Sequence, residues 1–269
     1  MSPQKRITVI LILLSFCAYY SNAFAQTDEK WIKEYTLESL DGTPQKVYLL
    51  HEIGADSYII KCSNDSIRID DTYGISGEPV ILNKNFLRIV YNPRLGSNQS
   101  CERVLFLCIS NKKLYIAMHV TLNYYYELTE VYNKKADSLK LFNEKSVYEL
   151  KLKLTGGNKN DYKLTANIHD MNSSKHDPST NYNYDDKTVL NFDAHENIFY
   201  NDFIELNTMF NVYDPDPAIG EHKQRITGNF PIIKLGKMEY YYINDRWYEG
   251  SKDDNGKNIL FGYSTSNAH

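Results

Sequence analysis

The stretch LYIAMHVTLNYYYEL, residues 114–128, alternates apolar and other side chains along its whole length. Its even-numbered positions carry leucine, isoleucine, methionine, valine or tyrosine, whereas its odd-numbered positions include His119, Thr121 and Tyr125. Successive side chains of a β-strand point to opposite faces, so this period of two predicts a strand with one buried face and one wet face. Most strands are shorter than this segment, and we therefore expect a bend or a β-bulge within it.

The same pattern extends in both directions along the chain. Residues 104–109 are apolar on both faces, and Asn111-Lys112 fits a tight hairpin turn leading into 114–128. Residues 148–154 and 162–168 alternate on either side of a glycine-containing turn and predict a second hairpin. Shorter strands are expected at 47–50, 57–61 and 66–69. We therefore predict an all-β fold in which antiparallel meanders and hairpins form a sandwich or rolled sheet, with very little helix.

Only one segment after residue 25 interrupts this strand pattern. Residues 134–145, KKADSLKLFNEK, read as a linker or a short helix. They would separate an N-terminal β lobe, 26–133, from a C-terminal β lobe, 146–263, and residues 264–269 would form a frayed tail.

The N-terminal residues have the composition of a signal peptide. Lys5 and Arg6 precede an apolar run at 7–16, and Ala23-Phe24-Ala25 supplies small residues at the two positions that a signal peptidase reads. The apolar run is shorter than the roughly 20 residues that span a bilayer. We expect cleavage after Ala25 and export to the periplasm, the cell surface or the medium, with no transmembrane anchor afterwards.

Charge and motifs narrow the classes of partner. The chain has 30 basic and 34 acidic residues, and Lys5 and Arg6 would leave with the signal peptide, so the mature net charge would be −6. No run of basic residues remains, which argues against nucleic acid and anionic membranes as partners. No dinucleotide, phosphate-binding or zinc motif is present, so we expect no cofactor and no metal.

Three cysteines, Cys62, Cys101 and Cys108, would remain in the mature chain. Cys108 lies in an apolar run and is expected to be buried as a hydrophobic side chain. Cys62 and Cys101 flank polar turns at strand ends, so they are the predicted disulfide pair in an exported protein.

Two polar segments, 170–187 and 214–224, are the predicted ligand-binding loops. If the strands around them form an up-and-down meander, both loops lie at the same end of it. Such a rim would offer oxygen ligands to a hard cation, or rings and carboxylates to a sugar. Asp, Asn, Pro and Ser are also ordinary turn residues, so the alternative is a pair of plain connectors. The predicted site residues are His176, Asp177, Tyr182, Tyr184, Asp185, Asp186, Asp214, Asp216 and His222.

Two tyrosine triplets, 124–126 and 240–242, invite comparison as an internal repeat. The first lies within an uninterrupted strand, where Tyr125 alone would face away from the apolar side. The second precedes Asn244-Asp245, which fits a hairpin turn that places Tyr241 opposite Tyr248. The triplets therefore differ in structure, and the expected aromatic platforms are Tyr125 and the Tyr241–Tyr248 pair.

These features favour an exported, non-enzymatic binding or interaction module. Tyrosine combines a flat apolar ring with a hydroxyl at low conformational cost, which suits the recognition of a glycan or of another envelope or extracellular partner. A structural envelope protein without a small ligand is one alternative. Another is a carbohydrate-active hydrolase, in which Asp214 or Asp216 would face Asp185 or Asp186 across a sugar. No nucleophile elbow or metalloprotease motif is present, which favours a non-enzymatic role over the hydrolase.

Overall fold

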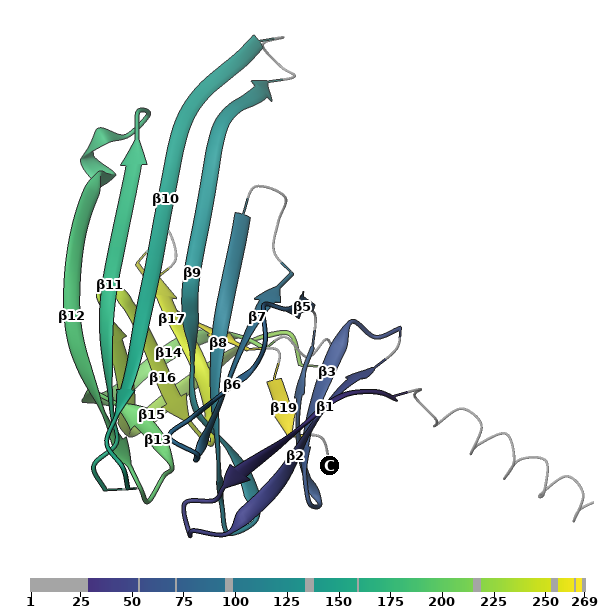
Figure 1. The fold of residues 1–269 in the computed structure, drawn as a ribbon. Coiled ribbons are helices and arrows are strands. Elements are labelled where there is room, and N and C mark those ends of the chain that lie inside the picture. The colour runs from purple at the N-terminus through teal and green to yellow at the C-terminus, as the bar shows by residue number, and fades with distance from the viewer. Residues whose placement is uncertain are drawn as a thin grey trace, which may run out of the picture.

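The structure is a computed structural model that describes residues 29–52, 54–70, 72–94, 99–133, 138–158, 160–214, 219–252, 256–263 and 265–267. The predicted signal peptide lies outside these residues. The fold is all-β, as predicted, and its strands form two open sheets and a closed barrel (Figure 1). Its described residues contain one short 3₁₀ turn, η1 (Pro178–Thr180). No helix among the described residues has the length and apolar character needed to cross a membrane.

The first open sheet has five strands in the order β1-β2-β3-β4-β19. The strands are β1 (Glu29–Glu38), β2 (Pro44–Glu52), β3 (Ser57–Cys62), β4 (Asp65–Ile69) and β19 (Thr265–Asn267). The expectation of a frayed tail is wrong for residues 265–267, because they pair with β4 in antiparallel register.

The second open sheet has nine strands, in the order β13-β12-β11-β10-β9-β8-β7-β5, with β6 also pairing with β7. Its strands are β5 (Thr72–Ile75), β6 (Val80–Leu82), β7 (Phe86–Pro93), β8 (Gln99–Ser110), β9 (Lys113–Asn133), β10 (Ser138–Thr155), β11 (Lys163–Ser174), β12 (Tyr182–Asp193) and β13 (Ile198–Tyr200). Residues 138–145, expected to be a linker or short helix, belong to β10. The sheet therefore continues across the boundary proposed between two lobes.

The barrel is closed by five strands in the order β14-β15-β16-β17-β18. They are β14 (Asp202–Tyr213), β15 (Glu221–Leu235), β16 (Met238–Ile243), β17 (Arg246–Lys252) and β18 (Asn258–Gly262). β14 and β18 pair in parallel and complete the closure. The predicted meander is therefore interrupted, because the chain passes from the nine-stranded sheet into the barrel between Tyr200 and Asp202.

Turn chemistry and bulges agree with the expectations for residues 104–128. Asn111 and Lys112 both have positive φ, 50° and 64°, as a type I′ hairpin turn requires. The register between β8 and β9 shifts beside Ala117 and again beside Leu122, which are the bulges expected in so long a strand.

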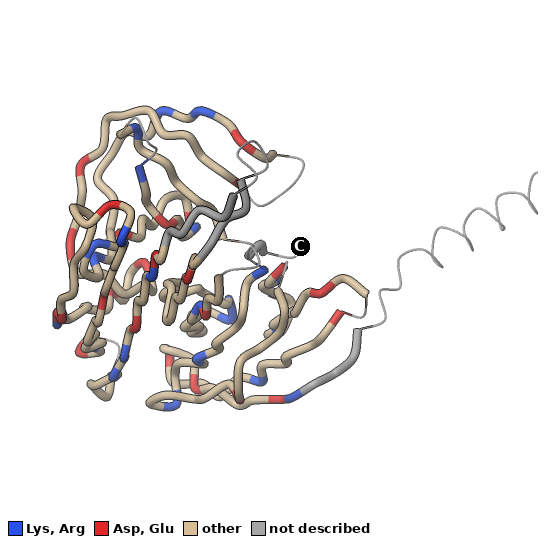
Figure 2. The backbone as a smooth tube through the Cα atoms, turned by 90° about the horizontal axis from the view of Figure 1, so that it is seen from above, with Lys and Arg blue, Asp and Glu red and all other residues tan. Residues whose placement is uncertain are grey.

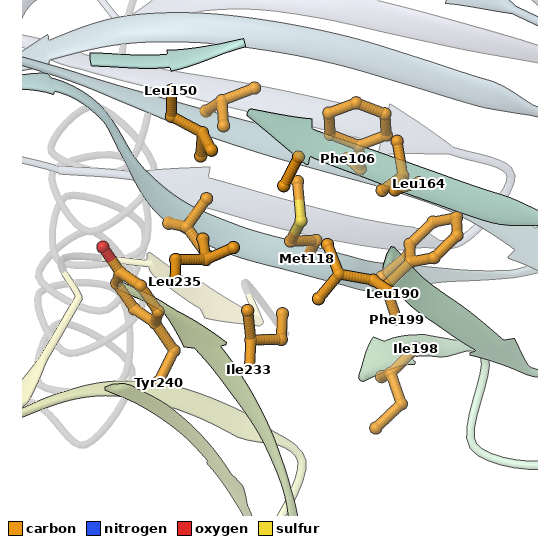
Figure 3. Close-up of a cluster of buried hydrophobic side chains, with 14 of the residues drawn as sticks. Phe106, Met118, Leu150, Leu164, Leu190, Ile198, Phe199, Ile233, Leu235 and Tyr240 are labelled. Atoms are coloured by element: carbon orange, nitrogen blue, oxygen red, sulfur yellow. The ribbon is translucent and has the colours of Figure 1, made fainter. Parts of the chain in front are cut away.

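The strand β8 lies between two hydrophobic cores. Val104, Phe106 and Cys108 join a core shared with the barrel, whereas Leu105 and Leu107 join a core shared with the five-stranded sheet. Alternate side chains point to opposite faces, so β8 is covered on both sides. Figure 3 shows the first core, where side chains from the nine-stranded sheet meet Ile233, Leu235 and Tyr240 of the barrel. A third core fills the barrel around Phe210 and Leu260.

The predicted disulfide is wrong. Cys62, Cys101 and Cys108 are all buried free thiols. Cys62 ends β3 in the five-stranded sheet, whereas Cys101 lies in β8 of the nine-stranded sheet opposite Tyr124. The two sulfurs therefore belong to different sheets, which local turn composition does not reveal.

Candidate functional site

The polar segment 170–187 is mostly strand, which corrects the expectation of a long loop. β11 continues to Ser174 and β12 begins at Tyr182, so only 175–181 connect them. Asp177 caps the η1 turn by accepting hydrogen bonds from the backbone N–H and the hydroxyl of Ser179, at 3.2 and 2.5 Å. The adjacent His176 is exposed.

The two predicted loops do not form one rim. Tyr182 and Tyr184 lie beside Lys237, at the start of β16, whereas Asp214 contacts Arg246, which pairs with Ile243 at the end of β16. Five residue steps along β16 correspond to about 17 Å. The break in the meander is the physical reason, because β14 and β15 belong to the barrel instead of extending the sheet.

The remaining predicted residues of segment 214–224 have local roles. The Asp214 side chain is only 4% exposed and accepts a hydrogen bond of 2.9 Å from Nη1 of Arg246. His222 is half-buried in β15 opposite Val212. Asp216 lies outside the described residues. The ion pair of Asp214 satisfies a buried carboxylate, which is a structural role.

Asp185 and the tyrosines of β12 lie on opposite faces of the sheet. Asp185 accepts a hydrogen bond from Nδ1 of His169, at 3.0 Å, on the face that carries Lys187. Asp186 is exposed and accepts a hydrogen bond from the backbone N–H of Lys187 at 2.7 Å. Tyr182 and Tyr184 face the barrel instead.

The predicted aromatic platforms have mixed outcomes. Tyr241 does pair with Tyr248, but Tyr241 is only 7% exposed and belongs to the barrel core, so this pair is not an exposed platform. Tyr125 is 38% exposed, donates a hydrogen bond to Glu127 and lies under the ammonium of Lys145.

A different set of tyrosines forms the strongest candidate site, which we call the tyrosine face. Strand pairing places Tyr124, Tyr148, Asp170 and Tyr184 side by side in one row across β9–β12, and Tyr126, Ser146, Asn172 and Tyr182 in the next row. Directly paired residues project from the same side of a sheet, so all eight share one face. Four strands span about 14 Å in this direction. Figure 1 shows the ends of β9–β12 extending past the barrel strands.

Hydrogen bonds fix the polar groups of this face. The Tyr184 hydroxyl donates to Asp170 at 3.0 Å, and the Ser146 hydroxyl donates to Oδ1 of Asn172 at 2.7 Å. Tyr148 is 4% exposed, and its hydroxyl has no hydrogen-bond partner among the described residues. A buried hydroxyl without a partner costs free energy.

Burial changes the acidity of the two tyrosines of β12. Desolvation, reinforced by the negative charge of Asp170, raises the pKa of Tyr182 and of Tyr184 to about 12. Both hydroxyls therefore stay protonated at neutral pH and are able to donate hydrogen bonds.

The barrel closes one side of the tyrosine face through the turn between β15 and β16. The Lys237 ammonium lies 3.0 Å from the ring centroid of Tyr182. Gly236 has a φ of 63°, and a Cβ at this position would lie 2.5 Å from the Tyr184 hydroxyl. Any residue other than glycine at position 236 is therefore disfavoured by the backbone conformation and by the close contact with Tyr184.

This arrangement suits recognition of a polyhydroxylated ligand. Half-buried tyrosine rings offer apolar surfaces, while Ser146, Asn172 and Lys237 offer hydrogen-bonding groups beside them. Within the described part of the chain, no group of three or more histidine, cysteine, aspartate or glutamate side chains is placed to hold a metal ion.

A second concentration of polar groups, some buried and some partly buried, lies between the barrel and the nine-stranded sheet. The Glu249 carboxylate lies 3.8 Å from the Arg103 guanidinium and accepts hydrogen bonds from Thr121 and Tyr263. His119 stacks on Tyr263 at 3.8 Å between ring centroids. We call these five residues the buried polar cluster. The odd-numbered face of 114–128 is thus not wet at this point, since His119 and Thr121 are both buried.

His119 gives the buried polar cluster a pH dependence. Burial, with the nearby charge of Arg103, holds the pKa of His119 well below its usual range. An unfolded chain takes up a proton below about pH 6.5, whereas the folded chain keeps the imidazole neutral. The free energy of unfolding should therefore fall as the pH is lowered below 6.5, with a contribution from His119 of up to about 1.4 kcal/mol per pH unit.

Urea unfolding at several pH values, for the wild type and for His119→Gln, would measure this contribution. Glutamine keeps a hydrogen-bonding group near Tyr91, whose hydroxyl lies 2.8 Å from Nε2 of His119. The variant should lose stability less steeply between pH 6.5 and 5. Identical slopes for the two proteins would contradict the assignment.

Of the eight residues of the tyrosine face, Tyr182 and Tyr184 are among the site residues predicted from the sequence, whereas six are not: Tyr124, Tyr126, Ser146, Tyr148, Asp170 and Asn172. The available signal was the spacing of Tyr124 and Tyr126, which matches that of Tyr182 and Tyr184. Tyrosines two apart on a strand share a face. The chain matches no protein-family model, no curated protein and no solved structure.

Proposed function

We propose that this protein is an exported, non-enzymatic binding module that recognises a glycan through the tyrosine face. The observation that supports this most directly is the pair of cross-strand rows that gather five tyrosines beside Ser146, Asp170 and Asn172. Sugar rings present apolar C–H surfaces and hydroxyls together, and this mixture of rings and polar groups complements both.

The carboxylates of the tyrosine face and of segment 214–224 do not form the pair that glycoside hydrolysis needs. A glycoside hydrolase needs two carboxyl groups facing one bond. On the tyrosine face, Asp170 is buried and hydrogen-bonded to Tyr184, while Asp185 lies on the opposite side of the sheet. Asp214 is held by Arg246 at the far end of β16. These three described carboxylates therefore do not provide an acid and a base across one ligand.

The double substitution Tyr126→Ala with Tyr182→Ala tests the proposal. Each ring is half-buried in the second row of the tyrosine face, and its loss removes one aromatic contact to the ligand. Affinity should fall about 10- to 100-fold, from roughly 1 kcal/mol for each ring. The measurement is a screen of wild-type protein against neutral and acidic oligosaccharides, followed by calorimetric titration of both proteins with the best ligand.

The matched control is Tyr73→Ala with Tyr125→Ala, which also removes two tyrosines. Tyr73 is 69% exposed, and Tyr125 points away from the tyrosine face. Circular dichroism would verify that both variants fold. Equal losses of affinity in the two variants, or no binding of any oligosaccharide to the wild type, would refute the proposal.

A further inference from the structure

The opposite side of β10–β12 carries a patch of lysines that no continuous part of the sequence reveals. Strand pairing places Lys151, Asn167 and Lys187 in one row, with Lys153 and Lys163 in the rows that follow. All four lysines are exposed. We call Lys151, Lys153, Lys163 and Lys187 the lysine face. Figure 2 shows basic and acidic residues interspersed along the chain, so it is strand pairing that gathers these four charges.

No carboxylate in the described part of the chain pairs with a lysine of the lysine face. Across the described residues, none of the four ammonium groups forms an ion pair with a carboxylate. The other side chains in their rows are neutral, namely Thr155, Thr165, Asn167, Val189 and Asn191. A local positive potential therefore persists on a chain with a net charge of −4.

A depression of about 500 Å³ adjoins this face. The basic residues Lys151 and Lys187 line it together with Asn167, Ile168 and His169, and the carboxylates Glu149, Asp185 and Asp186 also line it. Lysines two apart on a strand are separated by about 7 Å, and Lys151 and Lys187 by about 10 Å across two strand spacings. Ammonium groups at these intervals, with amide and hydroxyl groups between them, match a polymer that carries repeated anionic groups and hydroxyls.

We propose that the lysine face binds an acidic polysaccharide that carries carboxylate or sulfate groups. The charge of the lysines complements such a chain, and Asn167 and Thr165 provide hydrogen bonds for its hydroxyls. The acidic row of Glu149 and Asp185 limits the positive surface on one side, which disfavours a broad anionic membrane. The lysine face and the tyrosine face lie on opposite sides of the same strands. Binding at one face can therefore be disproved without disproving binding at the other.

The test uses the full chain with its four lysines changed to glutamine: Lys151→Gln, Lys153→Gln, Lys163→Gln and Lys187→Gln. The control changes four exposed lysines elsewhere, Lys113, Lys175, Lys223 and Lys252, to glutamine and has the same net charge. The probes are heparin and polygalacturonate, with dextran as a neutral polymer and phosphatidylglycerol vesicles as an anionic surface. Binding would be measured by biolayer interferometry at 20 and 150 mM salt.

The wild type and the control should bind both acidic polymers but not dextran, and more weakly at the higher salt concentration. The lysine-face variant should bind at least about tenfold more weakly, because four attractive charges are lost. Equal weakening of the control would overturn the proposal, as would the absence of binding to either acidic polymer. Binding of the wild type to vesicles but not to polymers would also overturn it, in favour of a lipid surface. Circular dichroism would verify that the lysine-face variant and the control are both folded.

Discussion

Trp247→Ala is expected to lower the free energy of unfolding by about 3–5 kcal/mol, the usual cost of removing a large buried aromatic side chain. Trp247 is 4% exposed and belongs to the core between the barrel and the nine-stranded sheet. Its ring packs against Tyr242 at 5.1 Å between centroids, and its indole N–H donates to the Ile116 carbonyl at 2.9 Å. The substitution therefore removes both apolar contacts and a hydrogen bond between strands of different sheets.

Two further variants would separate these contributions in urea unfolding. Trp247→Phe keeps a ring but loses the indole donor, and we expect a loss of about 1–3 kcal/mol from the unpaired carbonyl and the reduced volume. Phe203→Ala removes a ring that is 46% exposed and should cost less than about 1 kcal/mol. If the Trp247→Ala protein were no less stable than the Phe203→Ala protein, the Trp247 side chain would not stabilise the packing of the barrel against the nine-stranded sheet.

Glu249→Ala is expected to cost about 2–3 kcal/mol through a different mechanism. The Glu249 side chain is 22% exposed and that of Arg103 is 17% exposed, so the pair is partly shielded from water. Removing the carboxylate leaves the guanidinium without this partner, and the hydroxyls of Thr121 and Tyr263 lose their acceptor. Breaking a fully buried pair costs about 3–5 kcal/mol, and the residual exposure reduces this value.

The double variant Arg103→Met with Glu249→Ala distinguishes electrostatics from packing. Methionine fills part of the space without a charge, so the double variant should be more stable than Glu249→Ala alone. Chemical unfolding of both single variants and the double variant gives the coupling free energy. Strictly additive losses would mean that Arg103 and Glu249 do not stabilise one another.

The alternation of apolar and polar residues predicts most of the strands, but it does not predict which faces of a strand are covered by other parts of the protein. Residues 104–109 are apolar on both faces, and β8 lies between two cores, as such a sequence predicts. The polar His119 and Thr121 predicted a wet face, yet both are buried against polar groups from the barrel. The sequence of one strand shows which of its side chains are polar. The hydrogen-bond partners that allow those side chains to be buried come from distant segments of the chain.

The candidate site was harder to predict for a related reason. Segment 170–187 contains the end of β11 and the start of β12, but polar residues occupy both faces of these strands, so the segment lacks the apolar alternation that predicts a strand. Tyr126 and Tyr182 lie in the same row only because three successive pairs of strands, β9–β10, β10–β11 and β11–β12, have the right register. A register shift of one residue would place them on opposite sides of the sheet. The high tyrosine content suggests a recognition surface, but which tyrosines lie together on one face depends on the register of strand pairing.

The pairing of β19 with β4 has a consequence for how the chain matures during synthesis. β4 ends at Ile69, and its partner Thr265 follows roughly 200 residues later, a contact of very high sequence separation. At about 5–20 residues per second, a ribosome needs some 10–40 s to supply that partner. Throughout this interval the outer edge of β4 offers unsatisfied backbone groups to any nearby strand, including that of another nascent copy. Among the strands of the five-stranded sheet, β4 therefore waits longest during synthesis for the partner that covers its outer edge.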